Sequence, residues 1–95
     1  MLASIYGFGS YFKGSSSFSD IDILIVHNSN SVASCLEAIS LKNGLLERVD
    51  KASITMLSMS EEAELDFVRK ASAIYLLSYD GCNLCEIVSC IRAVR

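Results

Sequence analysis

Residues 7–26 have the sequence GFGSYFKGSSSFSDIDILIV, in which nine residues separate the pair Gly9-Ser10 from an Asp-x-Asp motif. The two acids, Asp20 and Asp22, lead directly into the tetrapeptide ILIV, the most strand-prone run in the chain. Side chains alternate across a strand, so both carboxylates project from the same face. Two carboxylates held that close repel each other, and a cation or a basic partner is needed to neutralise them.

The chemistry of these residues predicts a metal and phosphate site. Ligands that are all oxygen suit a hard ion such as Mg²⁺, which usually binds one or two carboxylates together with substrate phosphates. The turn at Gly9-Ser10 would offer backbone N–H groups to those phosphates. This stretch therefore predicts that a polyphosphate with its cation binds between the serine turn and the acid pair.

The same stretch resembles the signature of the DNA polymerase β-like nucleotidyltransferase superfamily. It is most similar to the minimal nucleotidyltransferases, the small cytoplasmic prokaryotic members. The match covers the first quarter of the chain closely and the remainder only in its alternation of strands and helices. The residues that carry it are Gly9, Ser10, Gly14, Ser19, Asp20 and Asp22.

The resemblance implies an activity: transfer of a nucleoside monophosphate from ATP or another nucleoside triphosphate to an acceptor hydroxyl, with Mg²⁺ as cofactor and release of pyrophosphate. Asp20 and Asp22 are then the catalytic residues and the metal ligands. Among the nucleotide-binding residues, Gly9 and Ser10 would hold the β- and γ-phosphates.

Two further nucleotide-binding candidates come from the resemblance. Lys13 would help to neutralise the phosphates, although an exposed, solvated lysine is an equally good interpretation. Ser19 would orient the metal loop or simply begin the strand. Neither residue forms a motif by itself.

A third carboxylate, which active members carry on the following strand, has no clear counterpart. By the rhythm of the chain it should fall near Ser53, which is a serine. Asp50 lies just upstream, but its parity places it on the opposite strand face unless a bulge intervenes. Either Asp50 is recruited, or the protein binds nucleotide with weakened or absent catalysis.

Composition narrows the remaining possibilities. The 95 residues are expected to form one domain, and 52% of them are hydrophobic, with no proline and a mean hydropathy of +0.41. The formal charge is −3 and the basic residues are scattered, which argues against a nucleic-acid partner. No run is long and apolar enough to cross a membrane, and no signal peptide is evident, so we expect a cytoplasmic protein.

Four cysteines raise the questions of zinc and of redox chemistry. Cys82 and Cys85 form a Cys-x-x-Cys, but a second such pair is absent and His27 is the only histidine. Because no thioredoxin-like βαβ context surrounds the pair, we expect the cysteines to be reduced and to behave as small buried hydrophobic residues.

The alternation of apolar runs and turn residues predicts an α/β fold, with a small mixed β-sheet of about four strands flanked by helices. Asn30 or Ser31 should cap the second helix, which Asn43-Gly44 should end, and Ser60 should cap the third. The second helix should bury Val32, Cys35, Leu36 and Ile39, and the third Leu65, Phe67 and Val68. Strands are expected at 3–8, 21–26, 52–57 and 73–78, and helical segments at 10–13, 32–41, 60–71 and 83–94.

The last predicted helix is apolar around most of its circumference. Such a helix needs burial on nearly all sides, and we expect it to form a homodimer contact or to dock on a partner. Minimal nucleotidyltransferases often pair with a helical protein of the HEPN type in toxin–antitoxin modules. The resemblance therefore also implies an alternative function, a catalytically weak nucleotide-binding, antitoxin-like subunit. A purely structural domain would leave the two acids unexplained.

Overall fold

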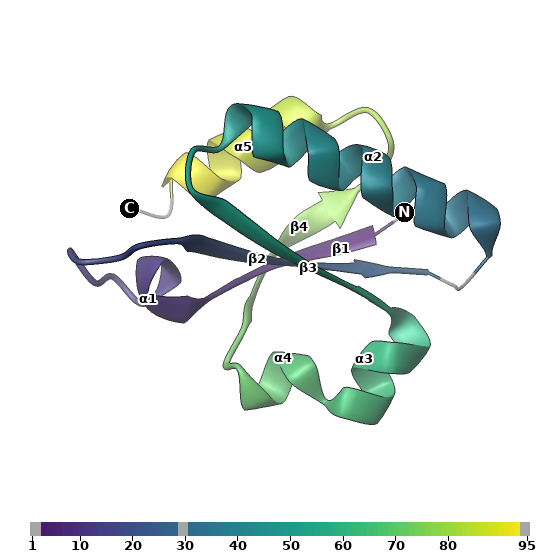
Figure 1. The fold of residues 1–95 in the computed structure, drawn as a ribbon, viewed down its shortest axis with the longest axis horizontal. Helices are drawn as coiled ribbons and strands as arrows, with labels where there is room; N and C mark the ends of the chain where they lie inside the picture. The colour runs from purple at the N-terminus through teal and green to yellow at the C-terminus, as the bar shows by residue number, and fades with distance from the viewer. Residues whose placement is uncertain (1–2, 29–30, 94–95) are drawn as a thin grey trace.

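A four-stranded mixed sheet forms the centre of the computed structural model, which describes residues 3–28 and 31–93 (Figure 1). Its strand order is β3-β2-β1-β4. Strand β1 is antiparallel to both β2 and β4, whereas β2 and β3 run parallel. Each strand lies within one residue of its predicted position: β1 Ala3–Phe8, β2 Ile21–His27, β3 Ala52–Ser58 and β4 Ile74–Tyr79.

Helices cover both faces of this sheet, which confirms the predicted α/β fold (Figure 1). The short helix α1, Gly9–Phe12, follows β1 at one end of the sheet. One face carries α2, Val32–Arg48, and α5, Leu84–Ala93, and the other carries α3, Met59–Leu65, and α4, Phe67–Lys70. We call these the α2/α5 face and the α3/α4 face.

The two faces are packed unequally. Alternate residues of β1 and β2 point to the α2/α5 face and form the main core with the two helices. The α3/α4 face has a smaller cluster around three buried residues, and there Phe8 and Phe67 meet edge to face at 5.2 Å between ring centroids. The fully buried apolar side chains of the main core are Ile5, Ile23, Ile25, Leu41, Leu45, Ile87 and Ile91.

Helix α2 is seven residues longer than predicted, because Asn43-Gly44 does not end it. A Cβ atom on Gly44 would lie 2.8 Å from Cδ2 of Leu84, so this glycine lets α5 approach α2 closely and does not terminate the helix. At the other end Ser31 is the N-cap and accepts a hydrogen bond from the Ser34 N–H at 3.2 Å. Asn30, the alternative cap, lies outside the described residues.

The predicted buried face of α2 is wrong. Val32, Leu36 and Ile39 are 74%, 60% and 42% exposed, and Cys35 is half-buried. The residues that face the core are Ala38, Leu41 and Leu45, on the opposite side of the helix. Both sides of α2 are apolar, so periodicity alone did not distinguish the side that the sheet covers.

The single helix expected at 60–71 is two helices. Ser58, rather than Ser60, caps α3 in a capping box with Glu61. Asp66 adopts a left-handed conformation with φ of 55° and separates α3 from α4. Phe67 and Val68 are half-buried as expected, but Leu65 is 51% exposed because it precedes this break.

Helix α5 is covered by its own fold to a greater extent than the sequence suggested. Ile87, Val88 and Ile91 are buried against the sheet and α2, and Leu84 is half-buried. Val94 lies outside the described residues. The main core therefore covers one side of α5, while Cys85 is exposed and Cys90 is half-buried, and the contact of this helix with a partner stays a prediction.

The four cysteines are free, and the prediction that they are buried is wrong. Cys82 and Cys85 are exposed, and Cys35 and Cys90 are half-buried. Among residues 3–28 and 31–93, no three histidine, cysteine or acidic side chains are grouped so that they could hold a metal ion. Across the same residues, every helix is too short or too polar to traverse a bilayer.

Candidate active site

The glycine-serine turn is anchored by the two aromatic residues that follow it. A Cβ atom on Gly7 would lie 2.5 Å from the Phe12 ring, so only glycine allows α1 to fold back over β1. The Tyr11 hydroxyl donates a buried hydrogen bond of 2.9 Å to the carbonyl oxygen of Ile91 in α5. These contacts hold α1, and with it Gly9 and Ser10, against the sheet end.

Gly9 lies directly against the carboxylate of Asp22. Its φ is +78°, and a Cβ atom there would overlap Oδ2 of Asp22. Asp22 is the register partner of Phe8, the residue just before Gly9. Glycine is thus required at position 9 for both its backbone conformation and the space it leaves. The serine turn and the second acid of the Asp-x-Asp motif are in van der Waals contact.

The two acids lie close enough to influence each other. Asp22 is half-buried on β2, with the parity of the α3/α4 face, and Asp20 is exposed just before the strand. A backbone hydrogen bond of 2.9 Å from Ile21 N–H to the Lys51 carbonyl fixes the chain between them. Burial raises the pKa of Asp22, and the negative charge of Asp20 raises it further. A bound cation would relieve both effects.

The other predicted nucleotide-binding residues are exposed around this pair. Ser10 lies in α1, and Lys13 ends that helix, its backbone N–H donating to the carbonyls of Gly9 and Ser10 at 3.2 Å each. Ser19 lies in the loop before β2. Within the described part of the chain, neither the Lys13 ammonium nor the Ser19 hydroxyl has a hydrogen-bond or ion-pair partner. The structure therefore leaves both side chains available without assigning them a contact.

The two candidates for the third-carboxylate position, Ser53 and Asp50, lie differently relative to Asp22. Ser53 is the register partner of Asp22 in the parallel β2–β3 pair, so their side chains lie next to each other on one face. Asp50 is exposed in the turn before β3, one residue ahead of Lys51, whose φ is 65°. The neighbour of Asp22 on β3 is thus a neutral hydroxyl.

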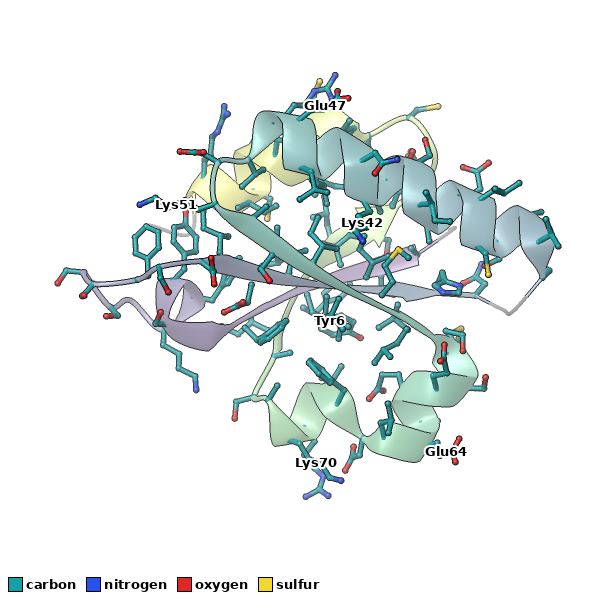
Figure 2. All side chains as sticks on the ribbon, viewed as in Figure 1. Tyr6, Lys42, Glu47, Lys51, Glu64 and Lys70 are labelled. Carbon is teal, nitrogen blue, oxygen red and sulfur yellow. The ribbon has the colours of Figure 1, made fainter. Side chains whose placement is uncertain are left out.

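Sequence reasoning missed how the loop 15–19 is held. Phe18 packs edge to face on Tyr11 at 5.0 Å, and the Lys51 ammonium lies 5.6 Å from the Phe18 ring centroid. Figure 2 shows Lys51 beside this end of the sheet. The only signal in the sequence was a single aromatic residue within a serine-rich loop.

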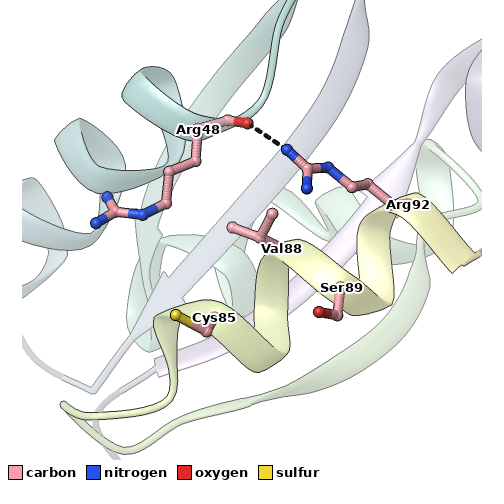
Figure 3. A pocket seen from close by; sticks show the side chains of 5 residues that line it. All are labelled: Arg48, Cys85, Val88, Ser89 and Arg92. Carbon is pink, nitrogen blue, oxygen red and sulfur yellow. Dashed lines mark hydrogen bonds between the residues drawn. The ribbon is translucent and has the colours of Figure 1, made fainter.

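A pocket of about 280 Å³ lies elsewhere, between the C-terminal end of α2 and one side of α5 (Figure 3). Arg92 donates a hydrogen bond of 3.0 Å to the Arg48 carbonyl oxygen, which closes the end of α2. None of the predicted site residues lines this pocket. Its lining residues are Arg48, Cys85, Val88, Ser89 and Arg92.

Comparison with known families supports the resemblance that the sequence motifs indicated. The family model for the nucleotidyltransferase domain matches residues 2–77, which include β1 through most of β4. The chain therefore belongs to the nucleotidyltransferase domain family, as the Gly-Ser and Asp-x-Asp motifs predicted. No curated protein and no solved structure matches the chain significantly.

Proposed function

We propose that this protein transfers a nucleoside monophosphate from a nucleoside triphosphate to an acceptor hydroxyl with the help of Mg²⁺. The observation that carries the proposal is the contact between Gly9 and the Asp22 carboxylate. It brings a phosphate-binding turn and a charged metal ligand to the same end of the sheet, where a triphosphate with its cation needs both.

The residues present fit Mg²⁺. Asp20 and Asp22 offer only oxygen donors, and the pKa of Asp22 is raised by burial and by the charge of Asp20, both of which a cation would offset. When bound, the ion would neutralise charge on the phosphates and on the leaving pyrophosphate. Gly9 and Ser10 would bind the β- and γ-phosphates, the Lys13 ammonium would balance their charge, and Ser19 would orient the loop that carries Asp20.

The test is transfer of label from α-labelled ATP in the presence of Mg²⁺. The Asp20→Asn/Asp22→Asn double variant is expected to lose transfer by at least about a hundredfold, since both metal ligands are neutral. Glu86→Gln is the matched control, because Glu86 is an exposed acid on α5, which covers the opposite face of the sheet from Asp22. Equal rates in all three proteins would refute the proposal.

Ser53 supports a second candidate, a nucleotide-binding subunit with weak catalysis that docks on a helical partner of the HEPN type. The side chain beside Asp22 is the hydroxyl of Ser53, and among the described residues no third acid is grouped with the pair. A carboxylate that could help to activate the hydroxyl of the acceptor substrate is therefore missing. This candidate predicts that ATP binds with Mg²⁺ and that no label is transferred. Unchanged nucleotide binding in the double variant would count against both candidates.

A further inference from the structure

The exposed side of α2 has the spacing of a coiled-coil seam. Its outward residues follow one another at intervals of four, three, four and three, which is the a/d pattern of a heptad repeat. Every one of them is exposed. In heptad order they are Val32 at d, Leu36 at a, Ile39 at d, Asn43 at a and Leu46 at d.

We propose that this stripe binds the same stripe of a second copy of the chain, so that the two α2 helices form a parallel, in-register coiled coil. We call residues 32, 36, 39, 43 and 46 the α2 seam. The residues that face the core, Ala38, Leu41 and Leu45, lie on the opposite side of the helix. The fold of one chain therefore leaves the seam open for the partner helix.

Charge complementarity selects the parallel orientation. In a parallel pair, a g residue faces the e residue five positions later on the partner helix. Lys42 occupies g and Glu47, five residues later, occupies e, so each Lys42 would face the other copy's Glu47 in two symmetric ion pairs. Figure 2 shows these two side chains on opposite edges of α2. Within the described residues Lys42 has no ion pair, and Glu47 has only a 3.8 Å contact with Arg48.

Asn43 supports the same register and a two-stranded assembly. Leucine at a with isoleucine at d would by itself favour more than two strands, whereas a single asparagine at an a position favours the two-stranded state in which the amides pair. Asn43 is exposed and lies at a, where its amide would meet the amide of the second copy. An antiparallel or shifted arrangement would place it against an apolar residue.

The length of the seam indicates a weak, reversible dimer. The 17 residues of α2 extend about 25 Å, or about two and a half heptads. The domain already holds the helix folded, so association does not bear the cost of helix formation. We expect a dissociation constant on the order of 10 µM, typical of a small interface.

The first experiment measures the mass of the full-length protein by light scattering across a concentration series. A dimer in equilibrium with monomer is expected, and Leu36→Glu should weaken it at least about tenfold because it places a charge in the seam. Leu65→Glu is the matched control, a similarly exposed leucine on α3, and should leave the dimer intact. A monomer at all concentrations, a larger assembly, or a dimer that persists in Leu36→Glu would overturn the proposal.

The second experiment tests the orientation through the charged pairs. Lys42→Glu and Glu47→Lys should each weaken the homodimer by about three- to tenfold, because both symmetric pairs become repulsive. Mixing the two variants should restore a heterodimer. On one side of it the two substituted positions carry opposite charges, and on the other side the native Lys42 of one chain faces the native Glu47 of the other. Failure of the mixture to associate more tightly than either variant alone would refute the parallel register.

A third measurement fixes the register directly. With the four native cysteines replaced by serine, Leu46→Cys should oxidise to a self-linked dimer, because the seam places both copies of position 46 side by side. Glu37→Cys, exposed on the same helix but off the seam, should not. Cross-linking only between Val32→Cys and Leu46→Cys chains would show an antiparallel pair and overturn the proposal.

Discussion

The two faces of the sheet differ in how many apolar side chains they bury and in the polar side chains they carry. The α2/α5 face carries nearly all of the fully buried apolar side chains, packed by two long helices. The α3/α4 face carries a small aromatic and aliphatic cluster, the half-buried Asp22 and the hydroxyl of Ser53. A half-buried carboxylate costs free energy, and it is tolerated here because the opposite face supplies most of the burial.

The largest difference between the faces should appear in truncations of buried leucines. Leu45→Ala, in the main core, is expected to lower the free energy of unfolding by about 3–5 kcal/mol, since it leaves a cavity at a fully buried site. Leu57→Ala, on the α3/α4 face, should cost about 2–3 kcal/mol. Urea unfolding of both proteins, with the exposed Leu65→Ala as control, measures the difference. A larger loss of unfolding free energy for Leu57→Ala than for Leu45→Ala would contradict the conclusion that the α2/α5 face contributes most of the stability.

Gly9→Ala tests the contact on which the α3/α4 face depends. The new methyl group would meet Oδ2 of Asp22 at a backbone conformation that alanine rarely adopts, so we expect a loss of about 1–3 kcal/mol together with weaker metal binding.

Gly14→Ala is its matched control. Gly14 has a similar φ of +83°, but nothing lies within 4 Å of the added Cβ position. It should therefore lose stability through backbone strain alone and keep its metal affinity. Calorimetric titration with Mn²⁺ or Mg²⁺ separates the two effects, and equal metal affinities in both variants would argue against the role given to Gly9.

Ser53→Asp would place a second carboxylate next to Asp22 on the α3/α4 face. Beside Asp22 it is expected to raise divalent-metal affinity about tenfold, or about 1.4 kcal/mol, and to lower stability in metal-free buffer through repulsion. Ser53→Asn, similar in size and neutral, is the control. If metal affinity is unchanged, Ser53 does not occupy the third-carboxylate position.

The smallest effect concerns pH. Because the folded pKa of Asp22 lies above its ordinary value of 3.8, ionisation of Asp22 weakens the fold as the pH rises through that raised pKa. Asp22→Asn should therefore unfold at a higher temperature than the wild type at pH 7 without metal, and at the same temperature near pH 3.

Glu61 is expected to affect stability with the opposite dependence on pH. Hydrogen bonds from the Ser58 backbone and side chain lower the pKa of Glu61 below 4.5, so its contribution to stability is present above that pH and is lost as the pH falls through the lowered value. Glu61→Gln should unfold at a lower temperature than the wild type at pH 7. Thermal scans at the two pH values distinguish the variants, and shifts of the same sign would be inconsistent with these assignments.

Local sequence predicted the positions of the strands correctly. All four strands lie within one residue of prediction, because apolar runs between turn residues have few alternatives. The Gly-Ser and Asp-x-Asp motifs also indicated the nucleotidyltransferase family, which the family model over residues 2–77 confirms. The prediction that Asn43-Gly44 ends the second helix was wrong. Glycine is common at helix ends, but Gly44 lies inside α2, where it leaves space for the Leu84 side chain.

The amino-acid order alone was enough to predict the four strands, Ser31 as a helix cap and the Asp-x-Asp motif before β2, because each depends on neighbours within a few residues. Three features emerged only from packing: the side of α2 that faces the core, the break at Asp66, and the contact of Gly9 with Asp22. Each depends on segments far apart in the chain. A helix that is apolar on both sides has no preferred inner face until a sheet covers one of them.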